Sequence, residues 1–192
     1  MEFSTVLFDA KENGVATVTL NRPESFNSFN DTQIGEVLAA CKLAEENDAI
    51  RVLIVTGSGK SFSAGGDAGM LATMKTSFDA RYIFDRSALL LKTIYNFPKP
   101  VIAALNGVAA GAATGCTLAC DIVIASEKAK FAANFVNIAF VPDGGTSYFL
   151  FNKLGHHRAA EILYTGKILT AEECLQAGIF NRVVPHDTLI DE

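Results

Sequence analysis

The chain has 192 residues, of which 49% are hydrophobic and 19% charged, and its 16 basic and 21 acidic side chains give a formal net charge of −5. This composition is typical of a globular protein with a large core and excludes a disordered chain. No basic stripe is present, so we expect no nucleic-acid partner. The first residues lack the pattern of a signal peptide, and we expect a cytoplasmic protein.

The predicted elements alternate between strands and helices along the chain. Asn13-Gly14 separates two alternating apolar runs, and such a pair is a strong hairpin signal. Strands are predicted at residues 6–10, 15–21, 51–56, 101–105, 121–125, 130–132 and 182–184, and helices near 31–47, 78–96, 112–119, 147–154, 157–165 and 171–177, with Thr146 as the cap of the helix at 147–154. The alternation predicts an α/β fold with a mainly parallel sheet that is covered on both faces.

Residues 101–125 form a long apolar stretch, but Asn106, Asp121 and three glycines interrupt it. These interruptions favour a buried strand, turn and helix over a membrane span. The four cysteines and three histidines show no metal-binding spacing, and the cysteines are predicted to be small buried residues, so we expect no metal site. No linker or repeat divides the sequence, which predicts a single domain over residues 1–192.

Two glycine-rich turns stand directly before predicted helices, at Ala64-Gly65-Gly66-Asp67 and at residues 107–112. A helix N-terminus carries unpaired N–H donors and a partial positive charge. If the two turns face each other, their amides form an oxyanion hole. Spacing alone leaves open that both turns are plain connectors.

Residues 56–61 end in Gly59-Lys60-Ser61 and suggest a phosphate-binding loop after a buried strand. The full motif requires a glycine at the position of Ile54, and the residues after Ser61 do not begin a long helix. Nucleotide hydrolysis is therefore disfavoured.

Four segments together resemble signatures of the crotonase (enoyl-CoA hydratase/isomerase) superfamily, in that family's order and spacing. They are Asn21-Arg22-Pro23 with Asn27, Phe62-Ser63-Ala64-Gly65-Gly66-Asp67, the stretch KPVIAALNG at residues 99–107, and Cys120-Asp121-Ile122. The resemblance covers nearly the whole chain. It implies a ββα spiral fold that binds acyl-CoA, with coenzyme A as part of the substrate and no separate cofactor.

By position, the resemblance makes the N–H of Gly66 the first oxyanion donor and that of Ala112 the second. The family usually has glycine at the position of Ala112, so the alanine must have a compatible φ. The resemblance also places the coenzyme A nucleotide beside the segment Glu24-Ser25-Phe26 and near Ala64, with Asp67 positioning the loop. The alternative role of Asp67 is a carboxylate that stabilises a helix N-terminus.

The acid and base residues decide the reaction. Hydratases of the family use two glutamates, and this chain has Gly115 and Phe135 at those positions. Asp143, in the segment VPDGGT, resembles the acid of enoyl-CoA isomerases. Its alternative reading is a turn or capping residue, as is common for Asp-Gly.

We therefore predict an enoyl-CoA isomerase of fatty acid metabolism or β-oxidation, in which Asp143 moves a proton between two carbons. Apolar walls that raise the pKa of this acid are predicted at Phe131, Phe135, Phe140 and Val141. An enoyl-CoA hydratase and a non-catalytic CoA-thioester-binding homologue remain alternatives. The family's further C-terminal helices are mostly absent from this sequence, which implies either a truncated chain or a natural short form. Where they are present, a homotrimer or hexamer is expected.

Overall fold

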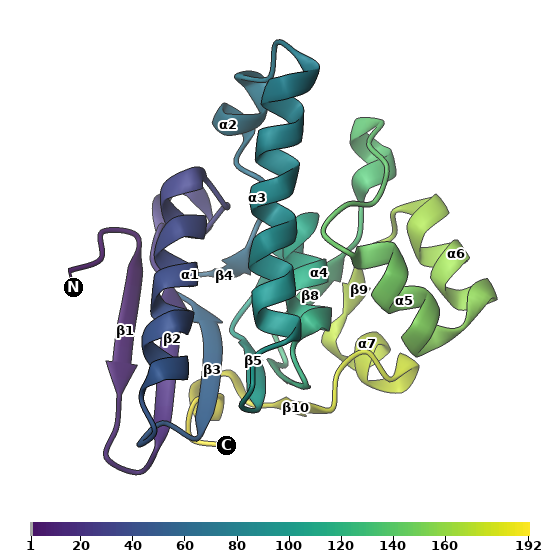
Figure 1. The fold of residues 1–192 in the computed structure, drawn as a ribbon. Helices are drawn as coiled ribbons and strands as arrows, with labels where there is room; N and C mark the ends of the chain where they lie inside the picture. Colours follow the sequence, from purple (N-terminus) through teal and green to yellow (C-terminus); the bar gives the residue numbers. More distant parts are fainter. Residues whose placement is uncertain (1) are drawn as a thin grey trace.

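The computed structural model describes residues 2–192, which form two sheets and the helices that pack on them (Figure 1). The strands are β1 (Val6–Ala10), β2 (Val15–Leu20), β3 (Val52–Gly57), β4 (Ser61–Ser63), β5 (Val101–Leu105), β6 (Val108–Ala110), β7 (Ile122–Ser126), β8 (Lys130–Ala132), β9 (Leu169–Thr170) and β10 (Arg182–Val184). The α-helices are α1 (Asp31–Glu46), α2 (Ala68–Ala72), α3 (Ser77–Tyr95), α4 (Ala112–Ala119), α5 (Thr146–Leu154), α6 (His156–Thr165) and α7 (Ala171–Ala177), and the 3-10 helices are η1 (Pro23–Ser25), η2 (Phe135–Ile138) and η3 (His186–Thr188).

The larger sheet has the strand order β1-β2-β3-β5-β7-β10. β1 and β2 are antiparallel, as the Asn-Gly pair predicts, and Gly14 turns the chain with φ of +88°. The pairs that follow, from β2–β3 to β7–β10, are all parallel. The predicted α/β fold with a mainly parallel sheet is therefore confirmed.

Helices α1 and α3 cover one face of the larger sheet (Figure 1). Alternate residues of β2, among them Val18 and Leu20, are buried in the main core together with Ile34 and Val37 of α1. Burial of one such aliphatic side chain stabilises the fold by roughly 1.5–3 kcal/mol.

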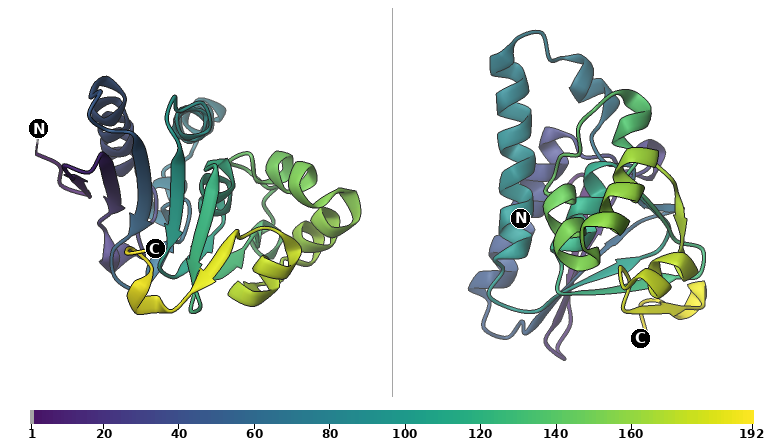
Figure 2. Two further views of the ribbon diagram at one scale, coloured as in Figure 1. Left: turned by 90° about the horizontal axis from the view of Figure 1, so that it is seen from below. Right: turned by 90° about the vertical axis from the view of Figure 1, so that its right-hand side faces the viewer.

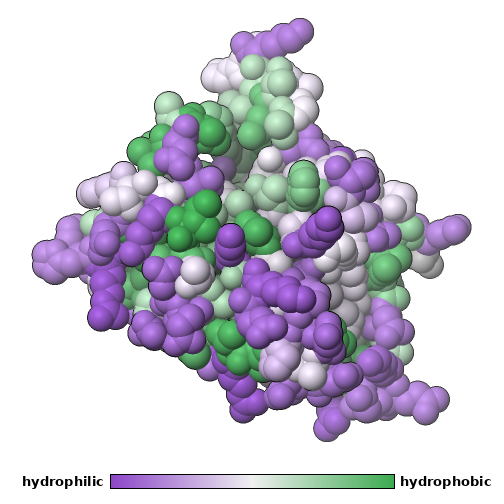
Figure 3. Space-filling model, turned by 180° about the vertical axis from the view of Figure 1, so that it is seen from behind, coloured by the Kyte–Doolittle hydropathy of each residue, from purple (hydrophilic) through white to green (hydrophobic). Residues whose placement is uncertain are grey.

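The prediction that both faces of this sheet are covered holds only in part for the opposite face, where Ala104, Ile124 and Val184 are buried with Leu189. There Ile54 and Ile102 are only partly buried, and the C-terminal segment after β10 packs on that side through Leu189 (Figure 2). Seen from behind, hydrophobic residues lie in groups between hydrophilic ones (Figure 3). The strand order explains why helices cover only one face. The chain advances in one direction from β2 through β3 and β5 to β7, and right-handed crossovers between these strands leave their helices on the same face.

The smaller sheet has the order β4-β6-β8-β9 and was not predicted as a separate layer. Residues 61–63 and 108–110 were expected to belong to turns, because both segments lie within glycine-rich runs. β4 and β6 are parallel neighbours. The turns that follow Ser63 and Ala110 therefore leave the same edge of the sheet side by side.

The helix predicted at residues 147–154 begins one residue earlier, so Thr146 is not its cap. Gly145, with φ of +67°, is the capping residue and offers no side chain. Thr146 is fully buried, and its hydroxyl lies 3.1 Å from that of Thr114 in α4. Its hydroxyl therefore points into the core instead of closing the helix end.

The four cysteines, Cys41, Cys116, Cys120 and Cys174, are buried free thiols, as predicted. Burial raises the pKa of Cys41 and Cys116 to about 12, so these thiols are unreactive at neutral pH. Within residues 2–192, no helix combines the length and the apolar character that a membrane crossing requires.

Candidate active site

The two glycine-rich turns meet at the edge of the smaller sheet. Gly65, with φ of +88°, packs against the second turn, and a Cβ at this position would lie 2.5 Å from the Ala110 oxygen and 2.9 Å from the Ala112 nitrogen. No side chain fits such a contact, so glycine is required here. Gly66 and Ala112 line the same cavity of about 190 Å³, which we call the turn cavity.

Both predicted donor amides are free of protein partners. Neither the N–H of Gly66 nor that of Ala112 donates a hydrogen bond to any group within residues 2–192. Ala112 is the first residue of α4, where the N–H has no partner inside the helix. Its φ is not positive, so the alanine fits without strain; the positive φ of this turn, +51°, lies at Gly111. The structure therefore brings to one cavity two amides without a partner among the described residues, which an oxyanion hole requires.

Asp67 holds the first turn in place. Its carboxylate caps α2 by accepting a hydrogen bond from Met70 N at 3.1 Å, and it also accepts from Arg22 Nη1 and Ser28 Oγ, both at 3.0 Å. Partial burial alone would raise the pKa of Asp67, but these hydrogen bonds outweigh it and hold the pKa below its usual value. The contacts support a positioning role for this residue.

The loop at residues 24–26 reaches the turn cavity through one hydrogen bond. Glu24 and Phe26 are exposed, Ser25 is half-buried, and the oxygen of Phe26 accepts from Ala64 N at 2.9 Å. Phe26 has a positive φ of 52°, and its side chain, 60% exposed, lies at the surface. Of these nucleotide-binding candidates, Ala64 lines the turn cavity.

Asn27, which follows the loop at residues 24–26, fixes that loop through buried side-chain hydrogen bonds. It also has a positive φ, of 56°, and is fully buried. Its amide group donates to Ser58 O at 2.9 Å and to Ser61 O at 2.8 Å, and its side-chain oxygen accepts from Arg22 N. An asparagine satisfies all three groups at once, because its side chain carries both donors and an acceptor.

Asp143 lies where the turn cavity meets a second cavity of about 490 Å³ between α3 and α5, which we call the helix cavity. Its Oδ1 is buried and has no hydrogen-bond partner within the described residues. Desolvation raises the pKa of this carboxyl group above its ordinary value. A carboxylate in this state is a stronger base than one in water.

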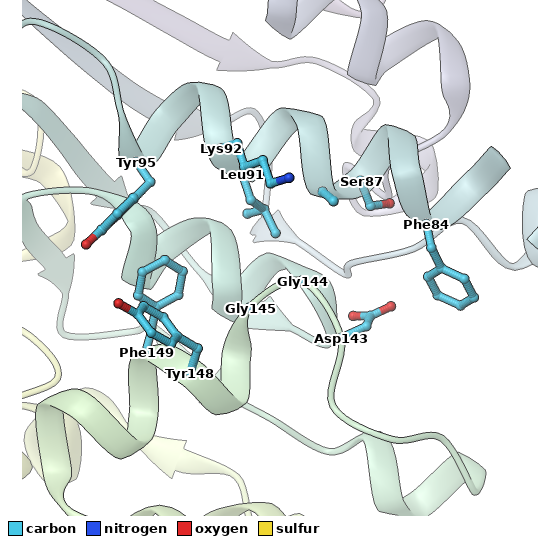
Figure 4. A pocket seen from close by; sticks show the side chains of 11 residues that line it. Phe84, Ser87, Leu91, Lys92, Tyr95, Asp143, Gly144, Gly145, Tyr148 and Phe149 are labelled. Atoms are coloured by element: carbon cyan, nitrogen blue, oxygen red, sulfur yellow. The ribbon is translucent and has the colours of Figure 1, made fainter. Parts of the chain in front are cut away.

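The helix cavity extends from Asp143 along α3 (Figure 4). Asp143 and Phe84 lie at one end, Tyr95 and Phe149 at the other, and Leu91 projects between them. Tyr95 and Phe149 contact each other with their ring centroids 5.3 Å apart. The lining is almost wholly apolar and suits a hydrocarbon group.

The predicted walls are half right. Phe135 and Phe140 line the turn cavity. Phe131 is fully buried in β8, where it packs on Phe180, and Val141 is 81% exposed, so these two predictions are wrong. The walls that sequence reasoning missed come from α3 and α5. The residues of α3 at positions 84, 87, 88, 91 and 95 follow the spacing of one helix face, which was a usable signal.

No carboxylate replaces the two glutamates that the resemblance locates at positions 115 and 135. Phe135 contributes a ring to the turn cavity, and Gly115 is buried inside α4. Asp143 is the one acidic side chain among the described residues that line the turn cavity.

This arrangement defines a class: an α/β protein whose paired turns offer two free amides beside one desolvated acid. Residues 10–192 match the enoyl-CoA hydratase/isomerase family, and the chain belongs to it. The structure of an enoyl-CoA hydratase from Bacillus anthracis superimposes with a TM-score of 0.94 at 32% identity, over 98% of this chain and 73% of that one. The expected crotonase fold is confirmed.

Two curated relatives have isomerase names. The chain is 36% identical to a trans-2-decenoyl-acyl-carrier-protein isomerase of Streptococcus mutans, over 98% of this chain and 73% of the relative. It is 38% identical to a 1,2-epoxyphenylacetyl-CoA isomerase of Escherichia coli, over 94% of this chain and 70% of the relative. Similar proteins thus include hydratases and isomerases, and membership of the family leaves the reaction open.

Proposed function

We propose that this chain isomerises enoyl thioesters by moving a double bond from C3 to C2, with Asp143 as the proton shuttle. The observation that carries the proposal is the buried, unpartnered Oδ1 of Asp143 beside the cavity that Gly66 and Ala112 line. A proton shuttle needs a base that no protein group already occupies, and it needs reach to the reacting carbons.

In the first step the ionised Asp143 takes a proton from C2, and the electrons of that C–H bond pass toward the thioester carbonyl to give a dienolate. The amides of Gly66 and Ala112 stabilise the negative oxygen. In the second step the Asp143 carboxyl group returns the proton to C4, and a double bond forms between C2 and C3. The ionised carboxylate of Asp143 is regenerated and no other reactant is required.

The neighbouring helix cavity provides apolar space of about 490 Å³ for the rest of the acyl group. Coenzyme A is the proposed carrier, with its nucleotide near Glu24, Ser25, Phe26 and Ala64. The Streptococcus mutans relative is named for an acyl-carrier-protein thioester. Assays should therefore compare thioesters of coenzyme A with thioesters of acyl carrier protein as well as different acyl groups. A trimeric or hexameric assembly stays a prediction.

Hydration is the second candidate, because the similar Bacillus anthracis structure is that of an enoyl-CoA hydratase. Against it, Asp143 stands alone among the acids in the described lining of the turn cavity, and activation of water by two carboxylates is not available there. A third reading is a protein that binds CoA thioesters without catalysis.

Parallel assays with 3-hexenoyl-CoA and 2-hexenoyl-CoA separate these candidates. We expect isomerisation of the first to exceed hydration of the second, and Asp143→Asn to lower kcat for isomerisation by about 10²–10⁴-fold, the range for loss of general acid–base catalysis. Hydration that persists in Asp143→Asn would identify a hydratase. Tight binding of both thioesters without turnover would identify a binding protein.

A further inference from the structure

A second feature of the site concerns how the Asp143 carboxyl group is held, since no other described residue donates a hydrogen bond to its Oδ1. Asp143 Oδ1 has no partner within the described residues, so the backbone on either side must fix its position. That backbone leads directly into Gly144, which has φ of +56°. The contacts of Gly144 therefore decide where the acid lies.

Gly144 rests against α4 at the place where Gly115 has no side chain. A Cβ built on Gly115 would overlap the carbonyl oxygen of Gly144, and it would lie 2.8 Å from the Gly144 carbonyl carbon and 3.1 Å from Thr146 Oγ1. Because two of these atoms belong to backbone, a methyl group there requires the loop itself to move. The other side of Gly144 faces Leu91 of α3 and the backbone of Ala112.

Buried hydrogen bonds tie the same loop to the start of α4. Thr114 Oγ1 donates to Gly111 O at 2.6 Å, which uses its proton, so the hydroxyl of Thr146 is the donor in the 3.1 Å contact between the two threonines. Thr146 N donates to Asp143 O at 3.0 Å. These contacts fix the position of Asp143 relative to the N-terminal end of α4, which carries the Ala112 amide.

We infer that Gly115 is a positioning residue for proton transfer. Its missing side chain lets the Gly144 carbonyl rest on α4, and this contact holds the Asp143 carboxyl group beside the Ala112 amide. The inference rests on the proposed function, because it assigns Gly115 to the same proton shuttle. The glycine at position 115 and the aspartate at position 143 then depend on each other, because any side chain at position 115 would displace the Asp143 carboxyl group.

The test is Gly115→Ala, assayed with 3-hexenoyl-CoA for turnover and with the saturated thioester hexanoyl-CoA for binding. We expect kcat to fall by roughly 10²-fold, the order of loss for a displacement near 1 Å. The Kd of hexanoyl-CoA should change by less than about threefold, because the two amides are untouched. The apparent pKa in the kcat/KM profile should fall toward that of an ordinary aspartate as the carboxyl group gains water.

Gly35→Ala is the matched control, because it makes the same substitution inside α1. A Cβ there would meet only the end of the Arg86 side chain, at 3.2 Å. Its kcat should equal that of the wild type, and its melting temperature should be unchanged or higher, since alanine favours a helix.

Thr146→Val supplies a second variant if Gly115→Ala does not fold. It removes the hydroxyl that ties the loop to α4, so kcat should fall while hexanoyl-CoA binding persists, and Thr146→Ser should lose less. Wild-type kcat in both Gly115→Ala and Thr146→Val, or an equal loss of binding and turnover, would overturn the inference. A wild type that does not isomerise, or an Asp143→Asn variant with full activity, would instead end the proposed function and this inference with it.

Discussion

The turn that carries Gly66 and Asp67 and the loop that carries Asp143 border the same cavity, yet the two carboxyl groups are held in opposite ways. Asp67 accepts hydrogen bonds from three different residues, and its pKa is lowered. Asp143 has a buried oxygen with no partner, and its pKa is raised by desolvation. One turn is fixed by polar contacts to its acid, and the other by packing of its backbone.

The difference suits two roles for the same kind of side chain, a structural role for Asp67 and the proposed catalytic role for Asp143. A carboxylate that accepts several hydrogen bonds is stabilised in its charged form and has little tendency to take a proton. A desolvated carboxylate without partners destabilises the fold slightly and binds a proton more strongly. The contrast supports Asp67 as a residue that positions the Gly66 amide and Asp143 as the base.

The pH dependence of kcat/KM for isomerisation is the largest expected effect that distinguishes the two acids. Asp143 must be ionised to take a proton from C2, so kcat/KM should fall about tenfold per pH unit below the raised pKa of this group. The profile should bend above the ordinary aspartate value of about 3.9. Asp67→Asn should leave the bend at the same pH. A wild-type profile that stays flat to below pH 5 would contradict the assignment of Asp143 as the base.

Much of this contrast was readable in the sequence. The periodic helices and strands were predicted within a few residues, and the resemblance located Gly66, Ala112 and Asp143 at positions that the fold brings to one cavity. Asp67 was assigned two possible roles, and its contacts are consistent with both, since its carboxylate caps α2 and also accepts hydrogen bonds from Arg22 and Ser28.

The features that sequence reasoning missed depend on distant contacts. β4 and β6 lie within glycine-rich runs that predict turns, and their pairing brings the two turns together. Likewise Gly115 gives no local signal, because the reason for the glycine is a carbonyl group 29 positions later along the chain (144 − 115). The cavity wall from α3 shows in the sequence as one helix face, but its position beside Asp143 depends on the fold.

Substitution of Asp67 should lower the thermal stability more than substitution of Asp143, which is the reverse of the expected order for activity. Asp67→Asn removes the charge that pairs with Arg22, and both side chains are mostly buried, with 18% and 16% exposed. We expect a loss of about 1–2 kcal/mol, because Arg22 keeps a hydrogen bond to Ser28 O and part of the site is solvated. For a chain of this size that corresponds to a melting temperature lower by roughly 2–8 °C.

Asp143→Asn is the matched control for this measurement, since it makes the same substitution at the unpartnered acid. Its melting temperature should equal or exceed that of the wild type at neutral pH, because a charge that lacks a partner is removed. If Asp143→Asn proved as destabilising as Asp67→Asn, the loop would depend on a contact of its carboxylate, and packing alone would not explain its position.

The smallest expected effect is the pH dependence of unfolding, in which the two acids should have opposite signs. The lowered pKa of Asp67 means that its contribution to stability is present above the ordinary value near 3.9 and is lost as pH falls through the lower folded value. The raised pKa of Asp143 means that its contribution is present below that value and is lost as pH rises toward the folded one. Each slope is at most about 1.4 kcal/mol per pH unit for one proton.

Urea unfolding of the wild type, Asp67→Asn and Asp143→Asn between pH 3 and pH 7 measures these slopes. Differences between proteins are needed because Glu36 also contributes at low pH: burial opposes its ionisation, but hydrogen bonds from Ser4 and Thr5 lower its pKa to about 2. The deficit of Asp67→Asn relative to the wild type should shrink as pH falls below about 4, whereas the advantage of Asp143→Asn should grow as pH rises above it. Two differences that change in the same direction with pH would mean that both carboxyl groups have similar surroundings, and the separation of a structural acid from a catalytic one would then fail.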